Sequence, residues 1–491
     1  MTRLSTASLG SLPSTVASPA YDRGSRASGI VHIGTGAFHK AHQAVYTDDA
    51  LAASGGAWMI TGVSLRSGDV ADQLNPQDGF YTLVVRGQEG TSARVIGSIA
   101  RVLVAPRERQ AVLDALASPE TKIVSLTITE KGYGVDPKTG GLDRAHASVA
   151  PDLAAPRAPS GAVGYIVEGL RLRRERGIAP FTALCCDNLP HNGRVLKRLV
   201  MEFANAVDPG LAAWIGDSVP FPSTMVDRIT PASTDRTFAE VEELIGQRDM
   251  AAVETEPFTQ WVVEDDFVAG RPDWEAGGAI FARDVAPYEK MKLRMLNGAH
   301  SMLAYSGYIA GHQYVRDVMG DAALAKLVER QMQAAAATLD LVPGVDLDAY
   351  AADLLARFAN PAIAHQTYQI AMDGTQKLPQ RLIEPAIVTL HSGASLDAYA
   401  FAVAAWMRYC LGMNEQGQTY ALRDPREAEI AALVGGADGD SGSIVDRLLG
   451  LPGLFPDELA TAPEWNTAVK TRLEAMLADG MRAAIEREAA R

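Results

Sequence analysis

The stretch that decides the fold is Gly29–Phe38, with the sequence GIVHIGTGAF. It is typical of a short buried strand that runs into a turn containing Gly34 and Gly36. Such a turn lets backbone N–H groups approach a pyrophosphate, and the N-terminus of the following helix opposes its negative charge. The third glycine of G-x-G-x-x-G is missing, because His39 takes its place. The stretch indicates a dinucleotide-binding turn, with an ordinary glycine turn after a strand as the alternative.

Apolar strand patterns and helical patterns alternate after this turn. Strands are predicted at Trp58–Leu65, Lys122–Thr129 and Phe181–Leu189, and a hairpin is predicted from Tyr81–Gly87 and Ala93–Ala105. Helices are predicted at His39–Ala53 and Ala162–Arg176. Strands that alternate with helices predict parallel β-α-β units and therefore an open α/β sheet.

The pattern changes to mainly helical beyond about residue 280. Alanine- and leucine-rich segments with helical spacing follow at Ala322–Leu339, Leu396–Met413 and Trp465–Glu488. We therefore predict a flexible N-terminal segment at 1–28, an α/β dinucleotide-binding domain at 29–279 and an α-helical domain for substrate at 280–491.

The composition limits the class of partner. The chain has 45 basic and 59 acidic residues and a net charge of −14, which argues against nucleic acid or an anionic membrane as a partner. No apolar run approaches the ~18 residues of a membrane span. Three cysteines with no C-x-x-C pair indicate a reducing compartment, so we expect a cytoplasmic protein. No Cys/His set has the spacing of a metal site, so we expect no metal.

Three polar residues interrupt the apolar segment KLRMLNGAH, residues 292–300. On an α-helix at ~100° per residue, Lys292, Asn297 and His300 share one broad face. Burial lowers the pKa of a lysine, which can then accept a proton, while an amide and an imidazole can hold a hydroxyl or an alkoxide. That combination suits oxidation of a secondary alcohol. The alternative is a lysine that reaches the surface and a satisfied core histidine.

Polar residues also follow the predicted strands, where open α/β sheets bind ligands. Residues 127–134, TITEKGYG, and residues 185–193, CCDNLPHNG, occupy such positions. Asp187 or Asn188 has a helix cap as its alternative role. Arg66, after the second strand, favours a 2′-phosphate or is a solvated surface residue, so the choice between NAD and NADP stays open.

Seven motifs carry a resemblance to a known family. In order they are HIGTGAFHKAHQA, TITEKGYG, CCDNLPHNG, FPSTMVDRITPA, WVVEDDF, YEKMKLRMLNGAHS and QIAMDGTQKLPQR. From about Ile30 to the C-terminus, the chain resembles the polyol-specific long-chain dehydrogenases, or mannitol dehydrogenase family. Within it, the chain is most similar to the fructuronate reductase (D-mannonate oxidoreductase) branch. Mannitol 2-dehydrogenases are the nearest alternative, followed by other polyol dehydrogenases such as arabinitol 4-dehydrogenase.

The resemblance implies a Rossmann-like N-terminal domain, an α-helical C-terminal domain and metal-independent hydride transfer between NAD, or NADP, and a sugar acid or polyol. It implies that Lys292 is the general base, that Asn188 and Asn297 hold the alkoxide oxygen, that His300 positions a neighbouring hydroxyl, that Glu289 relays protons, and that Asp227 and Lys377 line the substrate pocket. The coenzyme would be bound by Gly34, Gly36, Ala37, Phe38, Arg66, Thr129, Glu130 and Lys131. Family members are often monomers, and we expect a monomer here.

One position departs from the mannitol 2-dehydrogenase pattern, because Gln369 stands where those enzymes carry an arginine. Lys377 and Arg381 leave positive charge for the carboxylate of a sugar acid, provided that Arg381 points inward rather than to the surface. The alternative from another class is a nucleotide-binding protein without catalysis. It would be expected to show damage at the catalytic lysine or the glycine turn, and neither is damaged.

Overall fold

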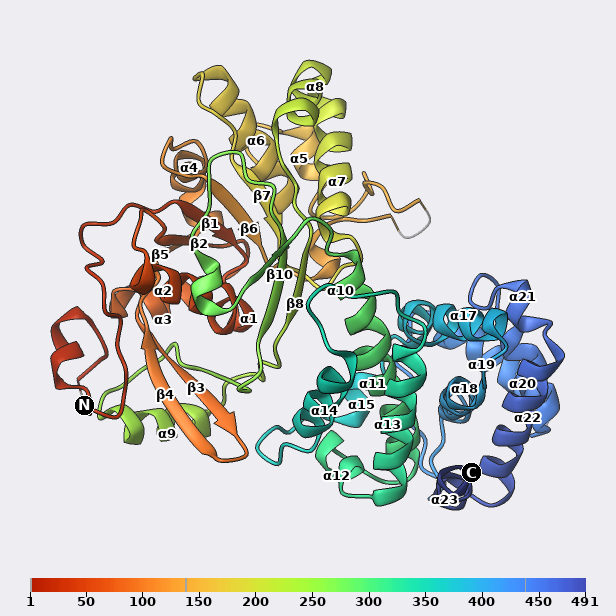
Figure 1. The fold of residues 1–491 in the computed structure, drawn as a ribbon. Helices are drawn as coiled ribbons and strands as arrows, with labels where there is room; N and C mark the ends of the chain where they lie inside the picture. Colours follow the sequence, from red (N-terminus) through yellow and green to blue (C-terminus); the bar gives the residue numbers. More distant parts are fainter. Residues whose placement is uncertain (1, 137–138, 438) are drawn as a thin grey trace. The chain divides into compact units, whose positions relative to one another are not determined.

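The computed structural model describes residues 2–136, 139–437 and 439–491. The chain divides into two compact units, residues 1–286 and 287–491 (Figure 1). The second unit therefore begins close to residue 280, where the sequence pattern changes from alternating to helical.

The first unit is built on a five-stranded sheet with the order β5-β2-β1-β6-β7. Its strands are β1 (Ile30–Ile33), β2 (Ile60–Ser64), β5 (Ile99–Val104), β6 (Ile123–Leu126) and β7 (Thr182–Cys185). All neighbouring pairs are parallel. The chain moves outward from β1 through β2 to β5 and then returns to the other side of β1 with β6. The predicted Rossmann-like parallel sheet is confirmed, and its topological switch point lies between β1 and β6.

Alternate residues of each strand enter two different cores, as expected when both faces of a sheet are covered. On one face, Val31 and Val124 pack with helices α4 (Ala105–Leu116), α6 (Ala162–Glu175) and α7 (Asn192–Val207). On the other face, Ile30 and Ile123 pack with α2 (Gln43–Ala53) and with the buried rings of Trp261 and Trp274. Figure 1 shows α4, α6 and α7 beside the sheet.

Two small sheets complete the first unit. Their orders are β4-β3-β9 and β11-β10-β8. Their strands are β3 (Tyr81–Gly87), β4 (Gly90–Ile96), β8 (Thr224–Asp227), β9 (Val253–Thr255), β10 (Gln260–Glu264) and β11 (Ile280–Ala282). The predicted hairpin is present as β3 and β4, but the second predicted strand, 93–105, divides into β4 and β5. The strand is interrupted at Gly97, which packs so closely that a Cβ there would lie 2.6 Å from Pro19 and 3.0 Å from Phe80.

The N-terminal residues differ from the predicted flexible segment. Leu4 is fully buried, and its N–H donates to the carbonyl of Arg248 at 2.9 Å. Val95 N–H donates to the carbonyl of Ala17 at 2.8 Å. The apolar side chains of Leu4 and Val16 pack in a small core with Phe80. The serine- and proline-rich composition of the segment gave no indication of this packing.

The other helices of the first unit are short, with at most 11 residues each. They are η1 (Thr6–Ser11), α1 (Ala37–Ala41), α3 (Asp69–Leu74), η2 (Asn75–Gln77), η3 (Glu130–Gly132), α5 (Ala150–Ala154), α8 (Pro209–Ser218), α9 (Asp235–Ile245) and η4 (Trp274–Gly277).

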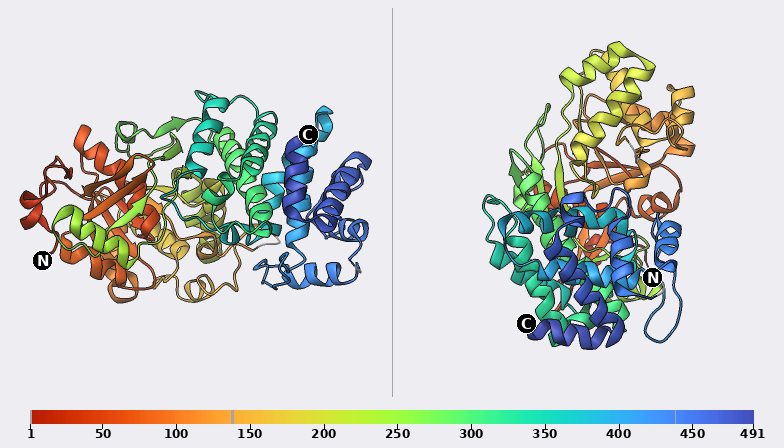
Figure 2. Two further views of the ribbon diagram at one scale, coloured as in Figure 1. Left: turned by 90° about the horizontal axis from the view of Figure 1, so that it is seen from below. Right: turned by 90° about the vertical axis from the view of Figure 1, so that its right-hand side faces the viewer.

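The second unit is helical, and its described residues contain no strand. Its elements are α10 (Ala286–Met291), π-helix η5 (Lys292–Asn297), α11 (Gly298–Ile309), α12 (Val315–Met319), α13 (Ala322–Ala336), α14 (Leu347–Phe358), α15 (Thr367–Ala371), α16 (Gly374–Leu378), π-helix η6 (Pro379–Ile383), α17 (Glu384–Ser392), α18 (Asp397–Tyr409), α19 (Glu427–Gly435), α20 (Ser441–Leu449), α21 (Asp457–Ala460), α22 (Pro463–Ala478) and α23 (Met481–Ala490). Figure 2 shows these helices from two further directions.

The helical segments predicted in the second unit are present with modified ends. The segment predicted at Trp465–Glu488 is broken at Gly480, whose φ of +83° an α-helix does not accommodate, into α22 and α23. None of the helices in the described part of the chain is long and apolar enough to cross a membrane.

Candidate functional site

The residues predicted to act in catalysis and binding fall into two groups, one on each unit. The first unit carries Gly34, Gly36, Ala37, Phe38, Arg66, Thr129, Glu130, Lys131, Asn188 and Asp227. The second unit carries Glu289, Lys292, Asn297, His300, Lys377 and Arg381.

The glycine turn after β1 lies at the switch point of the sheet. Gly34 has a φ of +96°, and a Cβ there would lie 2.1 Å from the carbonyl oxygen of Thr127, just beyond β6. The position therefore requires glycine. At Gly36 the nearest atom to a Cβ would be the Gly34 carbonyl oxygen at 3.7 Å, so the absent side chain leaves open space above the turn. This space fits the close approach of a coenzyme pyrophosphate to the backbone.

The helix predicted from His39 to Ala53 is wrong as one continuous helix. α1 ends at Ala41, and α2 starts at Gln43, because His42 has a φ of −124° and a ψ of −98°. The His42 ring is held 3.1 Å from the carbonyl oxygen of Gln260 and stacks on Phe38 with centroids 4.9 Å apart. Sequence periodicity carries no signal for such a tertiary contact.

The other predicted coenzyme residues lie near the C-terminal ends of β1, β2 and β6. Ala37 and Phe38 are half-buried at the start of α1, and Arg66 is exposed two residues after β2. Thr129 is exposed with a φ of +65°, and Lys131 is exposed in η3. The side chain of Glu130 lies outside the described part of the chain.

Asp187, in the loop after β7, forms hydrogen bonds with the loop after β6. Its carboxylate accepts hydrogen bonds from Ile128 N at 2.8 Å, Thr129 N at 3.1 Å and the Tyr133 hydroxyl at 2.6 Å. Asp187 therefore caps a loop of the neighbouring strand rather than a helix. Asn188 follows it and is exposed.

Asp227 is the last residue of β8 and is buried, with 5% of its surface exposed. It pairs in register with Gln260 of β10. Its place in the substrate pocket stays a prediction.

In the second unit, the segment 292–297 forms a π-helix. A π-helix bonds residue i to residue i+5, so Lys292 and Asn297 lie about one turn apart and on the same side. The α-helical spacing of ~100° per residue predicted for this segment is therefore wrong, although it also puts these residues on one face. Lys292, Asn297 and His300 are buried, with 8%, 7% and 6% of their surfaces exposed. π-helical turns occur frequently at functional sites.

His300 and Asn297 each have a polar atom without a partner in the described structure. The Nε2 atom of His300 and the Nδ2 atom of Asn297 are both buried and make no hydrogen bond. Burial and the nearby His365 and Arg381 hold the pKa of His300 well below its ordinary value, so its imidazole is neutral. An unmet buried polar atom is costly unless a ligand satisfies it, which argues against a satisfied core histidine.

Arg381 faces the helix that carries these residues, so the surface alternative for it is wrong. It lies in the second π-helix, η6, and its Nη1 donates to the Asn297 carbonyl at 3.4 Å and to Ser301 Oγ at 3.3 Å. Burial lowers the pKa of Arg381 to about 10. A Cβ at Gly298 would lie 2.8 Å from the Arg381 carbonyl oxygen, which explains the glycine in LNGAH.

Lys377 and Glu289 lie near these two π-helices in sequence. The Nζ atom of Lys377 donates to the carbonyls of Met372 at 2.6 Å and Ile370 at 3.3 Å, and the side chain is half-buried. Glu289 is half-buried in α10, three residues before Lys292.

Sequence reasoning missed two residues beside His300. The Phe358 ring, at the end of α14, stacks on His300 with centroids 4.3 Å apart, and His365 stands edge-on to it at 5.4 Å. The Nδ1 atom of His365 is buried without a partner in the described structure. Burial, and then Lys377, lowers the pKa of His365. In the sequence, the one indication of a role for His365 was its position four residues before the motif QIAMDGTQKLPQR, which begins at Gln369.

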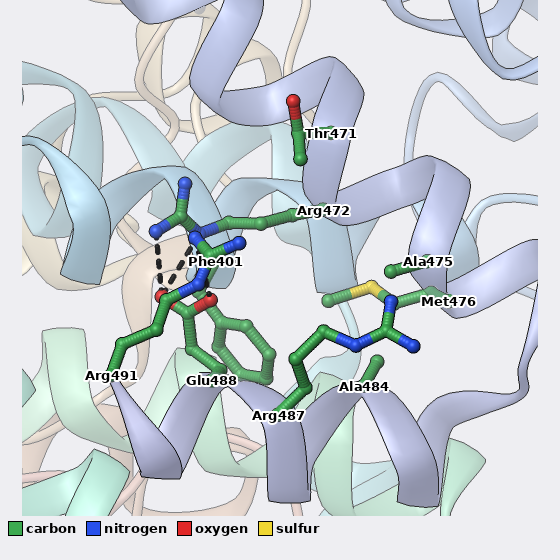
Figure 3. A pocket seen from close by; sticks show the side chains of 9 residues that line it. All are labelled: Phe401, Thr471, Arg472, Ala475, Met476, Ala484, Arg487, Glu488 and Arg491. Atoms are coloured by element: carbon green, nitrogen blue, oxygen red, sulfur yellow. Dashed lines mark hydrogen bonds and ion pairs between the residues drawn. The ribbon is translucent and has the colours of Figure 1, made fainter.

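Two other features do not join this site. No group of three or more His, Cys, Asp or Glu among the described residues could hold a metal ion. A small pocket between α18, α22 and α23 is lined by three arginines, but it shares no residue with the predicted site (Figure 3). There, Glu488 accepts from Arg472 at 2.6 Å and pairs with Arg491 at 3.4 Å, so the pocket is a structural ion-pair cluster.

Family models match both units. The mannitol dehydrogenase Rossmann domain matches residues 28–276, and the mannitol dehydrogenase C-terminal domain matches residues 284–477. The chain belongs to the mannitol dehydrogenase family. It is therefore an oxidoreductase with a Rossmann domain, as the sequence motifs predicted.

Several members of the mannitol dehydrogenase family are similar over almost the whole chain. D-mannonate oxidoreductase of Escherichia coli K12 is 46% identical over 475 residues, which cover 95% of this chain and 97% of that protein. Mannitol 2-dehydrogenase of Phaeosphaeria nodorum is 38% identical, covering 95% and 82%. The solved Pseudomonas fluorescens mannitol 2-dehydrogenase, in a ternary complex with NAD and D-mannitol, is 38% identical with a TM-score of 0.85, covering 99% of each chain.

Proposed function

We propose that this protein transfers a hydride reversibly between NAD and a secondary alcohol of a sugar acid, with D-mannonate and D-fructuronate as the substrate pair. The observation that carries the proposal is the buried group of Lys292, Asn297 and His300 beside the guanidinium of Arg381. It combines a buried amine and two unmet polar atoms on η5 and α11 with a cation on the neighbouring π-helix η6.

Each of these side chains has a chemical role in the proposed reaction. During oxidation Lys292 accepts the hydroxyl proton as the hydride leaves the same carbon, and during reduction it returns that proton. Asn297 donates through Nδ2 to the developing alkoxide, with Asn188 as a second donor. His300 binds a neighbouring hydroxyl through Nε2, and Glu289 passes the proton onward to water. Bound NAD supplies the nicotinamide that takes up the hydride.

Positive charge supports a carboxylate substrate. Arg381 lies against the Asn297 carbonyl, and Lys377 is near enough to lower the pKa of His365, after the larger effect of burial. Loss of the arginine at Gln369 disfavours a pocket of the mannitol type. The 46% identity to D-mannonate oxidoreductase, against 38% to mannitol 2-dehydrogenases, supports the same choice. We include His365 among the substrate-contacting residues and Asp227 and Lys377 in the pocket lining.

The glycine turn supports a dinucleotide coenzyme, and the relative solved with NAD supports NAD. Gly34 and Gly36 carry no side chain at two positions of the turn, and the solved relative with NAD is 38% identical over an alignment that covers 99% of this chain. Arg66 is exposed beyond β2, at a position where a 2′-phosphate of NADP would also find a cation.

The experiment follows NADH and NADPH absorbance with mannonate, altronate, mannitol, arabinitol and sorbitol in parallel. We expect kcat/KM to be highest for mannonate with NAD. A preference for uncharged polyols would reject the sugar-acid assignment in favour of a mannitol 2-dehydrogenase. NADH binding without turnover of any of these compounds would favour a non-catalytic nucleotide-binding protein.

A further inference from the structure

A chain of side-chain hydrogen bonds runs beneath the glycine turn of the first unit and ends on it. Thr127 Oγ1 donates to the Gly34 carbonyl oxygen at 2.9 Å. His32 lies 2.8 Å from Thr127 Oγ1 through Nε2 and 2.8 Å from Ser125 Oγ through Nδ1. Ser125 Oγ lies 2.8 Å from the side-chain amide of Gln43. His32, Ser125 and Gln43 are almost completely buried, so water does not compete for these bonds.

The donor and acceptor in each of these hydrogen bonds can be assigned by starting at the Gly34 carbonyl oxygen, which can only accept. Thr127 uses its single hydroxyl hydrogen on the Gly34 carbonyl, so Nε2 of His32 must carry a hydrogen and donate to Thr127. Burial lowers the pKa of His32 to about 3, so the ring is neutral near pH 7 and Nδ1 is an acceptor. Ser125 must then donate to Nδ1, and its oxygen needs a donor from Gln43.

The side-chain amide of Gln43 provides this donor when it is turned by 180°. In the structure its Oε1 faces Ser125, while its Nε2 is buried without a partner. The two ends of an amide have nearly the same shape, so hydrogen bonding decides its orientation. In the turned orientation Nε2 donates to Ser125.

His39 lies beside the same amide. Both of its ring nitrogens are buried without a partner in the described structure, and its ring stacks on that of His32 with centroids 3.4 Å apart. Burial lowers the pKa of His39 well below its ordinary value, and the Gln43 side chain, close beside the ring, offsets this only in part.

We propose that neutral His32 is a positioning residue for the coenzyme turn: a hydrogen-bond chain directed from Gln43 through Ser125, His32 and Thr127 to the Gly34 carbonyl fixes the backbone that receives the dinucleotide. The inference rests on the proposed function, in which this turn binds NAD. None of these four side chains touches the coenzyme in the proposal. They act through the conformation of Gly34, which already has a positive φ and packs against Thr127.

The test measures NADH binding, which needs no sugar substrate. NADH fluorescence is titrated with wild type, Thr127→Val and Thr127→Ser. Valine keeps the shape of threonine and removes the hydroxyl, so we expect the dissociation constant for NADH to rise about tenfold, the effect of one lost hydrogen bond. Serine restores the hydroxyl, and we expect Thr127→Ser to stay within about twofold of wild type. At saturating NADH we expect kcat of Thr127→Val to fall less than about threefold, because the hydroxyl acts on coenzyme binding.

A matched control replaces a buried threonine at the opposite end of the sheet. Thr182 begins β7, and its hydroxyl accepts from Val268 N at 3.2 Å. Thr182→Val removes one hydrogen bond of a buried threonine without touching the glycine turn. We expect it to bind NADH within about twofold of wild type.

The tautomer is tested separately by ¹⁵N NMR of histidine-labelled protein, with the His32 signal assigned by its loss in His32→Gln. We expect a neutral ring with the hydrogen on Nε2 between pH 5 and 9. An imidazolium in this range would overturn the proposal, as would wild-type affinity for NADH in Thr127→Val or equal damage in Thr127→Ser. Failure of the wild type to bind NADH would overturn both proposals. Selective loss of NADH binding in Thr127→Val, in a protein that oxidises no sugar acid, would support the inference and reject the proposed substrate alone.

Discussion

The imidazole of His365 stands edge-on to the imidazole of His300, with ring centroids 5.4 Å apart and planes at 84°. The stacked ring of Phe358 lies against the His300 ring, so His300 is held between defined neighbours. Each of the two imidazoles has a buried nitrogen without a partner in the described structure. Two rigid, neutral rings that each keep one unmet nitrogen are suited to bind adjacent hydroxyls of a substrate.

His365 provides the first prediction. We expect His365→Leu to raise KM for the preferred substrate about tenfold, because one hydrogen bond to the substrate is lost, with NADH affinity unchanged. His365→Asn keeps a polar group and should recover part of the loss. The control is His391→Leu, an exposed histidine of α17. Steady-state kinetics measure the effect, and a KM of His365→Leu equal to wild type would remove His365 from the substrate site.

Lys292 provides the second prediction. We expect Lys292→Ala to lower kcat by about three orders of magnitude or more, because proton transfer loses its base, while NADH binding persists. Lys290→Ala is the matched control, since Lys290 lies two residues earlier, is exposed and pairs at 3.6 Å with the exposed Asp340. It should leave kcat within about twofold of wild type. Near-normal turnover by Lys292→Ala would reject the mechanism.

The sequence predicted the parts of the fold that depend on local pattern. Short apolar strands separated by helices correctly indicated the parallel sheet, and the glycine turn falls at its switch point. The kink at His42 and the burial of Leu4 were not predictable, because both depend on contacts with residues distant in sequence.

The candidate site shows the same division. Lys292, Asn297 and His300 were selected because polar residues in an apolar helix need an explanation, but the π-helical turn has no sequence signature here. The orientation of Arg381 depends on the approach of η6 to Gly298. His365 carried no motif of its own, since only its packing on His300 marks it.

Lys377 provides the third prediction, which concerns substrate charge. We expect Lys377→Met to raise KM for mannonate about tenfold or more, and KM for mannitol less than about threefold, since only the sugar acid offers a carboxylate. Lys326→Met is the control, because Lys326 also donates to a main-chain carbonyl, that of Ala489, at 2.6 Å. Equal effects on mannonate and mannitol would mean that Lys377 supports the pocket without recognising charge.

Asp187 provides the fourth prediction, which concerns stability. Asp187→Asn replaces a carboxylate that accepts three hydrogen bonds and places an amide N–H against a donor. We expect the free energy of unfolding to fall by about 1–3 kcal/mol. Asp143→Asn is the control, since Asp143 accepts from Ala145 N at 2.9 Å within its own turn. Urea unfolding followed by tryptophan fluorescence measures both, and an unchanged midpoint for Asp187→Asn would show that the loop holds without this carboxylate.

The buried histidines provide the last prediction, which concerns pH. Burial lowers the pKa of His32 to about 3 and places that of His39 well below its ordinary value, so neither binds a proton in the folded protein near pH 5. The unfolded chain binds these protons below about pH 6.5. The contribution of these histidines to the free energy of unfolding therefore has its full value above about pH 6.5 and falls as the pH drops toward 3, by about 1.4 kcal/mol per pH unit for each histidine. Burial raises the pKa of Glu168 to about 7, which changes the free energy of unfolding in the opposite direction. The total dependence on pH therefore combines several groups.

The decisive measurement compares the slope of the free energy of unfolding against pH, between pH 6.5 and 5, in wild type and His39→Gln. We expect the slope to be smaller in His39→Gln by the contribution of about one histidine. Identical slopes would mean that His39 takes up its proton while folded.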